Sequence, residues 1–186
     1  MSPANGWESA VPPRVEWPEP VRQTEAGALV TDVILTTFQL NGRLMEVAQE
    51  LGANGGLTAA WWQVLGGILD QPRSVSAIGR RMGMTRQGVQ RVADLLVERG
   101  LAEYRQNPDH RRAKLLTCTE AGYWAIRQIA LVQHPFANRL GAEIGSDRLR
   151  ETLATMRALV SVLAATPPQA ALSAASDSGQ PASMQA

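Results

Sequence analysis

Apolar residues recur every three or four positions over most of the chain, a spacing typical of amphipathic helices. It predicts one long helix from Thr24 to Leu51 and a second that follows a Thr58 cap and stops before Pro72. A third begins at a Thr119 cap and should kink or end at His134-Pro135, because proline cannot donate a backbone hydrogen bond. Ser146 should cap a last helix. The pattern predicts a mainly helical protein.

The stretch from Ser74 to Gly100 predicts two shorter helices joined by a tight turn. Ser74 can cap the first helix, and Gly83 can adopt the left-handed conformation that ends it. Met84 should fill the turn with an apolar side chain. Thr85 can then cap the second helix, because its hydroxyl can accept a hydrogen bond from a free backbone N–H group.

The helix that follows Thr85 has two chemically different faces. At about 100° per residue, its apolar side chains gather on one side, and the opposite side carries arginine and glutamine. The polar face comprises Arg86, Gln87, Gln90, Arg91 and Asp94. Arginine and glutamine near a helix N-terminus are typical of a recognition helix that reads base edges. An arginine-rich surface helix without that role is the alternative.

Two short strands are predicted after this helix. They span Leu101 to Arg105 and Ala113 to Thr119, and the basic segment between them contains Asn-Pro-Asp, a strong turn signal. Such a hairpin would form a wing. The expected fold class is mainly α with a small β-hairpin wing (α+β), a winged helix-turn-helix core flanked by further helices.

Charge is unevenly distributed, although the net charge is only +1. The segment from Arg73 to Lys114 holds ten Lys and Arg against four Asp and Glu, and the remainder holds eight against thirteen. A positive charge concentrated on one module indicates a nucleic-acid-binding surface.

These residues resemble the multiple-antibiotic-resistance regulators, the MarR family. The resemblance rests on SAIGRRMGMTRQGVQRVADLLVERGLAEY and NPDHRRAKLLTCTEAG and covers roughly Thr24 to Thr166. The family's wing carries Asp-x-Arg and then a Leu-Thr-x-x-Gly helix start. Asp109 and Arg111 match the first motif, and Cys118 replaces the leucine of the second. The resemblance implies a dimeric DNA-binding regulator.

The predicted DNA-binding residues come from the two short helices and the wing. Arg86, Gln87, Gln90 and Arg91 form the reading face, and Arg111 and Arg112 should contact the minor groove or flanking phosphates. The full set is Ser74, Thr85, Arg86, Gln87, Gln90, Arg91, Asp109, Arg111, Arg112 and Lys114.

Three segments are expected along the chain. Residues 1–23 are proline-rich and expected to be a disordered arm, and residues 167–186 a disordered tail. Residues 24–166 should form the MarR-like domain, with DNA binding in 57–118 and dimerisation through 24–51 and 119–166. An a/d seam on the last helix supports pairing with a second copy; an intramolecular helical subdomain is the alternative. The seam comprises Leu149, Leu153, Met156, Val160 and Leu163.

Family members often bind small aromatic ligands between the dimer helices and the reading head, so Phe38, Trp61 and Trp124 are candidates to line such a pocket. Plain core packing is the alternative for these aromatic residues, and Trp62 is assigned to the core. Cys118 is expected to be a small core residue, with a redox role as the alternative. His110 and His134 lack nearby ligands at metal-binding spacing, so no metal, no cofactor and no enzymatic activity are expected.

One cysteine excludes an internal disulfide, and no apolar run is long enough to span a membrane. No signal peptide is evident. A cytoplasmic protein, nucleoid-associated when bound to DNA, is expected. Three functions remain open: a sequence-specific regulator, acting as a ligand-responsive repressor on a pseudo-palindromic operator; an architectural DNA-binding protein; and a winged-helix protein-interaction module.

Overall fold

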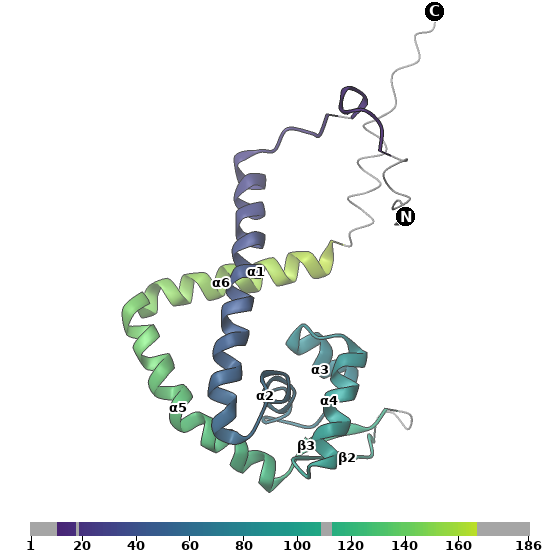
Figure 1. The fold of residues 1–186 in the computed structure, drawn as a ribbon, viewed down its shortest axis with the longest axis vertical. Helices are drawn as coiled ribbons and strands as arrows, with labels where there is room; N and C mark the ends of the chain where they lie inside the picture. The colour runs from purple at the N-terminus through teal and green to yellow at the C-terminus, as the bar shows by residue number, and fades with distance from the viewer. Residues whose placement is uncertain (1–10, 18, 109–112, 167–186) are drawn as a thin grey trace, which may run out of the picture. The chain divides into compact units, whose positions relative to one another are not determined.

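The computed structural model describes residues 11–17, 19–108 and 113–166. The chain divides into two compact units, Met1–Ala48 and Gln49–Ala186. Helix α1 (Glu25–Gly52) begins in the first unit and ends in the second (Figure 1).

The first unit contains a short 3₁₀ turn, η1 (Arg14–Glu16), and most of α1. Trp17 donates its indole N–H to the carbonyl of Pro12 at 2.8 Å, and the Arg14 guanidinium lies 5.5 Å from the centre of its ring. The arm that the sequence predicts to be disordered therefore contains a single 3₁₀ turn at Arg14–Glu16. Local contacts are sufficient to form a single turn, because proline already fixes its own backbone φ angle in the unfolded chain.

Helix α1 begins where the sequence predicts. The hydroxyl of Thr24 accepts a hydrogen bond from the N–H of Gly27 at 3.1 Å. Large apolar side chains along α1 are nevertheless exposed: Leu29, Val30, Val33, Ile34, Leu35, Phe38, Leu40 and Leu44. An exposed apolar surface of this length is typical of an interaction surface.

The second unit is a winged helix. Four of its helices begin at the predicted side-chain caps: Thr58, Ser74, Thr85 and Thr119 accept hydrogen bonds from backbone N–H groups three residues further on. Its elements in chain order are η2 (Ala53–Gly55), α2 (Ala59–Gly66), β1 (Arg73–Ser74), α3 (Val75–Met82), α4 (Arg86–Glu98), β2 (Ala102–Arg105), β3 (Leu115–Cys118), α5 (Glu120–Ile144) and α6 (Ser146–Ala165).

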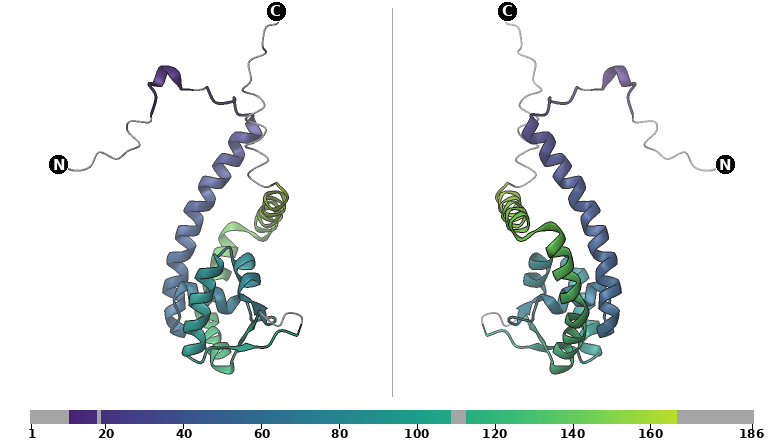
Figure 2. Two further views of the ribbon diagram at one scale, coloured as in Figure 1. Left: turned by 90° about the vertical axis from the view of Figure 1, so that its right-hand side faces the viewer. Right: turned by 90° about the vertical axis from the view of Figure 1, so that its left-hand side faces the viewer.

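A three-stranded antiparallel sheet has the order β1-β3-β2. The predicted hairpin is confirmed, with Ala102 opposite Cys118 and Arg105 opposite Leu115. Figure 2 shows the hairpin extending away from helices α2 to α4. Strand β1 was not predicted, because two residues carry no detectable periodicity.

Arg73 holds β1 in place. Its guanidinium donates to the carbonyl of Gly67 at 2.7 Å and binds both carboxylate oxygens of Asp70. The hydrogen bond from Arg73 holds the pKa of the Asp70 carboxyl well below its usual range. This contact connects the loop after α2 to the start of the sheet, next to the cap of α3.

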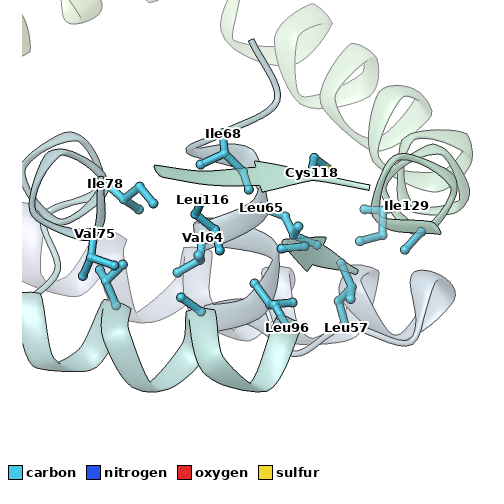
Figure 3. Close-up of a cluster of buried hydrophobic side chains, with 14 residues drawn as sticks. Leu57, Val64, Leu65, Ile68, Val75, Ile78, Leu96, Leu116, Cys118 and Ile129 are labelled. Atoms are coloured by element: carbon cyan, nitrogen blue, oxygen red, sulfur yellow. The ribbon is translucent and has the colours of Figure 1, made fainter. Parts of the chain in front are cut away.

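The core joins these helices to the sheet. Leu65, Ile68, Ile78, Leu96 and Leu116 are almost fully buried and converge from α2, the turn after it, α3, α4 and β3, as Figure 3 shows. The first half of α5 adds Ala125 and Ile129. This packing fixes α3, α4 and the sheet as one body.

One sequence prediction needs correction. Ser146 is the first residue of α6, and Gly145, at φ +91°, precedes it without a side-chain cap. The sequence predicted a kink or an end at His134-Pro135, and α5 continues through Pro135 to Ile144. Trp62 packs against the core as predicted, and Trp61, for which core packing was the alternative, packs against it too.

Candidate nucleic-acid interface

The turn between α3 and α4 has the predicted geometry. Gly83 has φ +65°, and the N–H of Met84 donates to the carbonyl of Gly79 at 2.9 Å. A Cβ on Gly79 would lie only 2.8 Å from the carbonyl oxygen of Met84. The close approach of α3 to the turn therefore requires glycine at this position.

Helix α4 separates its two faces as the sequence predicts. Val89, Ala93 and Leu96 are buried on one face. Arg86, Gln87, Gln90 and Arg91 are exposed on the other. Arg86, Gln87 and Arg91 make no hydrogen bond or ion pair with other residues that the structure describes, so their side chains remain available to a partner.

Four predicted residues from three separate segments of the chain line one pocket. Ser74, Arg86, Gln90 and Lys114 line a hollow of about 380 Å³ between the start of α3, the exposed face of α4 and the base of the wing. Ser76, Asp94 and Tyr104 also line this pocket. Two cationic side chains and hydroxyl groups on one surface suit contact with a nucleic-acid backbone.

Tyr104 is a component of this surface that the sequence did not reveal. Its hydroxyl donates to Asp94 Oδ1 at 2.8 Å, and Gln90 Nε2 donates to the same carboxylate oxygen at 2.9 Å and to the Tyr104 hydroxyl oxygen at 2.8 Å. Lys114 Nζ lies 5.8 Å from the centre of the Tyr104 ring. Fourteen residues separate Gln90 from Tyr104, so helical periodicity could not predict the contact.

The environment of Tyr104 favours its neutral form. Burial is the main cause, and the hydrogen bond to Asp94 adds to it; together they raise the pKa of Tyr104 to about 12. At neutral pH the phenol therefore keeps its proton and donates to Asp94.

The wing is described only at its strands. Asp109, Arg111 and Arg112 lie outside the described residues, so their predicted contacts are not tested. At the base of the hairpin, Arg105 pairs with Glu103 at 2.6 Å. Lys114 is the predicted wing residue that the structure does place, and it is exposed beside Tyr104.

The aromatic candidates for an effector pocket have different surroundings. Phe38 on α1 is 70 % exposed and Trp124 on α5 is 66 % exposed. Trp61 is half-buried, with the Arg99 guanidinium 5.4 Å from the centre of its ring. Core packing therefore does not account for Phe38 and Trp124, and a role for the three residues in ligand binding remains a prediction.

The seam on α6 is exposed along its length. Its five side chains are between 38 and 69 % exposed: Leu149, Leu153, Met156, Val160 and Leu163. Nothing in the described part of the chain buries this seam.

Cys118 occupies a core position. Its side chain is 7 % exposed, and burial raises the pKa of the thiol to about 11. A buried thiol with a raised pKa is poorly reactive, which supports the structural role predicted for Cys118.

The described residues offer neither a metal site nor a membrane-spanning helix. They contain no group of three or more His, Cys, Asp or Glu side chains able to hold a metal ion. None of the described helices is long and apolar enough to cross a membrane.

A helix-turn-helix, a three-stranded sheet with a projecting hairpin and an exposed basic face on the second helix together define a winged-helix DNA-binding protein. Residues 55–113 match the family model described as MarR family. The chain belongs to the MarR family and is a DNA-binding transcription regulator.

Curated relatives cover most of the chain. It is 40 % identical over 144 residues to the uncharacterized proteins Rv2011c of Mycobacterium tuberculosis and Mb2034c of Mycobacterium bovis, covering 77 % of this chain and 98 % of each relative. The match is longer than residues 55–113, so the relationship extends beyond the segment that the family model matches.

Solved structures share the fold at lower identity. The transcriptional regulator BldR from Sulfolobus solfataricus matches with a TM-score of 0.66 and 16 % identity, over 76 % of this chain and 100 % of BldR. Staphylococcus aureus MarR in complex with salicylate and kanamycin has a TM-score of 0.62 and 17 % identity, over 75 % and 95 %. CouR from Rhodococcus jostii bound to p-coumaroyl-CoA has a TM-score of 0.62 and 20 % identity, over 71 % and 94 %.

Proposed function

We propose that this protein is a sequence-specific repressor that binds a pseudo-palindromic operator as a homodimer and is released by a small aromatic effector. The observation that carries the proposal is the exposed face of α4, where Arg86, Gln87 and Arg91 are unpaired within the described chain beside the pocket that Arg86 and Lys114 line. Arginine and glutamine are side chains able to distinguish guanine and adenine in the major groove.

The proposed role of each DNA-binding side chain follows from the element on which it lies. Gln87, Gln90 and Arg91 would read base edges, with Arg86 nearer the backbone. Ser74 and Thr85 accept backbone hydrogen bonds through their oxygens, so each keeps a hydroxyl proton to donate to phosphate. Arg111, Arg112 and Lys114 would contact the minor groove or phosphates from the wing, with Asp109 bracing Arg111.

A homodimer is supported by the apolar surface that the chain leaves exposed. The seam on α6 and the apolar side chains of α1 are open to solvent in this chain. A second copy would bury them and would place two copies of α4 about one DNA turn apart, roughly 34–36 Å. Bound across a promoter, such a dimer would block polymerase.

The proposed effector is a small aromatic molecule. The structures of Staphylococcus aureus MarR with salicylate and of CouR with p-coumaroyl-CoA show that relatives in fold bind aromatic molecules. Phe38, Trp61 and Trp124 are the residues of this chain proposed to contact one.

Selection of bound sequences from random DNA by the purified protein tests the function. An inverted repeat with half-sites about one turn apart is the expected result. Binding without a consensus would favour an architectural DNA-binding protein. No binding at all would favour a protein-interaction module.

A further inference from the structure

Two adjacent arginines, Arg80 and Arg81, lie in the last turn of α3, and the structure gives them different surroundings. The Arg81 guanidinium lies 3.7 Å from the carboxylate of Asp70, measured between Nη2 and Oδ2. Arg80 is exposed and makes no hydrogen bond or ion pair with other residues that the structure describes. Within the described chain, Arg80 is therefore a cation that the fold itself does not use.

Arg80 lies on the edge of α3 that borders α4, the helix against which α3 packs (Figure 1). Ser76, one turn earlier on α3, lines the pocket of about 380 Å³ together with Arg86 of α4. Residues four apart share a helix face, so Arg80 continues the row that Ser76 begins. Gly79 lies beside this row and packs against the turn, since a Cβ there would meet the carbonyl oxygen of Met84 at 2.8 Å.

Arg81 lies on a different face of α3. It follows Arg80 by one residue, which places it about 100° further around the helix and about 140° from Ser76. Its partner Asp70 belongs to the loop after α2 and does not line the pocket. The two arginines therefore have the same charge at the same end of one helix, but only Arg80 is next to the exposed face of α4.

We propose that Arg80 and Ser76 bind the DNA backbone, with the Arg80 guanidinium on a phosphate beside the groove that α4 enters. This proposal rests on the proposed function, in which α4 reads the major groove. The first helix of a helix-turn-helix crosses the backbone while the second lies in the groove, so the edge of α3 next to α4 is the part nearest to the phosphates.

The chemistry of the two side chains suits this position. A guanidinium can donate two parallel hydrogen bonds to the oxygens of one phosphate, and a serine hydroxyl can donate one. Such contacts carry no sequence information, but they fix the register and orientation of the protein on the duplex. Arg80 and Ser76 are thus positioning residues for the base readout by α4.

Arg80→Ala and Arg81→Ala form a matched pair of variants of the full chain. Fluorescence anisotropy measures their affinities for the selected operator and for a random duplex over a range of salt concentrations. Arg80→Ala should weaken binding to both duplexes alike and should reduce the slope of log affinity against log salt by about one. Arg81→Ala should leave that slope unchanged. The same loss of charge would lower affinity equally in both variants if only the overall field of the protein mattered.

The size of the effect follows from the salt dependence of a single phosphate contact. One contact contributes roughly 3.5-fold to the loss of affinity between about 50 and 200 mM salt. The defect of Arg80→Ala relative to the unmutated protein should shrink by that factor over the same range. Arg80→Lys keeps the charge and should keep the slope, whereas Ser76→Ala should lower affinity with no change in slope, because a hydroxyl carries no charge.

A scan of the operator with single methylphosphonates, which are neutral, locates the contact. At the phosphate that Arg80 binds, the unmutated protein and Arg80→Ala should bind with equal affinity. At the other positions the difference between them should remain. A scan in which no single position removes the difference overturns the proposal.

The remaining outcomes are also distinguishable. Circular dichroism establishes that each variant is folded, and Arg80→Gln with Arg81→Gln makes the same comparison if an alanine variant is not. Equal salt slopes for the two arginine variants, or a loss at Arg80 on the operator alone, overturn this inference and leave the proposed function intact. If the unmutated protein binds neither duplex, the proposed function fails and this inference fails with it.

Discussion

The hydroxyl of Tyr104 illustrates how a single polar atom is specified by its surroundings. It is half-buried, donates to Asp94 and accepts from Gln90. A buried polar group without partners would destabilise the fold, whereas a satisfied one fixes the relative position of the two elements that supply it. Tyr104 thus connects the wing to α4.

We predict that Tyr104 ionises at unusually high pH. Its pKa is raised to about 12 from a reference value of 10.0. Because the neutral form is favoured in the folded state, this contribution to stability is complete below pH 10 and is lost as pH rises through about 12. Asp94→Asn should lower the pKa, because the carboxylate that opposes ionisation is removed. Ultraviolet absorbance of tyrosinate measures the titration.

Tyr104→Phe is the control for that assignment. It should remove the high-pH step while the rest of the titration is kept. Persistence of the step in this variant would assign it to another group. An unchanged pKa in Asp94→Asn would show that the hydrogen bond to Asp94 contributes nothing to the shift.

At the scale of elements, the start of α5 depends on contact with the turn between α4 and β2. The Thr119 hydroxyl donates to the carbonyl of Gly100 at 2.7 Å while it caps α5. A Cβ on Gly122 would lie 2.1 Å from the carbonyl oxygen of Leu101 and 2.7 Å from Cys118 Sγ. The first turn of α5 can therefore approach the sheet only with glycine at residue 122.

We predict that Gly122→Ala lowers the free energy of unfolding by about 1–3 kcal/mol, the usual cost of overpacking. Chemical denaturation measures the change. Gly42→Ala is the matched control, since a Cβ at Gly42 would meet no atom of the chain within 4 Å. It should stabilise α1 by about 0.5–1 kcal/mol, because alanine favours helix more than glycine does. Equal effects of the two substitutions would contradict the close packing.

A separate prediction concerns Arg91 on helix α4. We expect Arg91→Ala to weaken binding to the selected operator far more than binding to random duplex at the same salt, because a base contact distinguishes sequences and a phosphate contact does not. Fluorescence anisotropy measures both affinities. Arg148→Ala, which removes an exposed charge from α6, should affect neither by much. Equal losses on both duplexes would assign Arg91 to the phosphates.

At the scale of the whole molecule, the chain leaves more apolar surface exposed than one copy can bury. The exposed side chains occur on α1, α5 and α6, outside the well-packed core around Leu65 and Leu116. A monomeric soluble protein rarely exposes extended apolar patches. The proposed homodimer would remove them from water.

We predict that Leu153→Glu combined with Met156→Glu converts a dimer to a monomer, because two buried carboxylates would oppose each other across the seam. Sedimentation at micromolar concentration measures the mass. Ala154→Glu combined with Ala158→Glu adds the same charge to the opposite face of α6 and should leave the dimer intact. A monomer in the unmutated protein would contradict the prediction directly.

The sequence by itself determined the helices, their caps, the hairpin and the two faces of α4. The helices, their caps and the two faces of α4 depend on neighbours within about four residues, so the identity of Thr85 or the spacing of Val89, Ala93 and Leu96 is sufficient to predict them. The hairpin was predicted from the Asn-Pro-Asp turn signal between its two strands. The family resemblance could also be recognised from the sequence, because its motifs are continuous in the chain.

The tertiary structure decided what distant residues do together. Strand β1 exists because Arg73 and Ser74 pair with β3, and no local pattern predicts a two-residue strand. Gln90 was predicted to lie on the reading face, and its amide nitrogen also bonds to Asp94 and to Tyr104, which comes from another element. Which polar atoms of a side chain have partners depends on three-dimensional neighbours, and a linear sequence does not specify them.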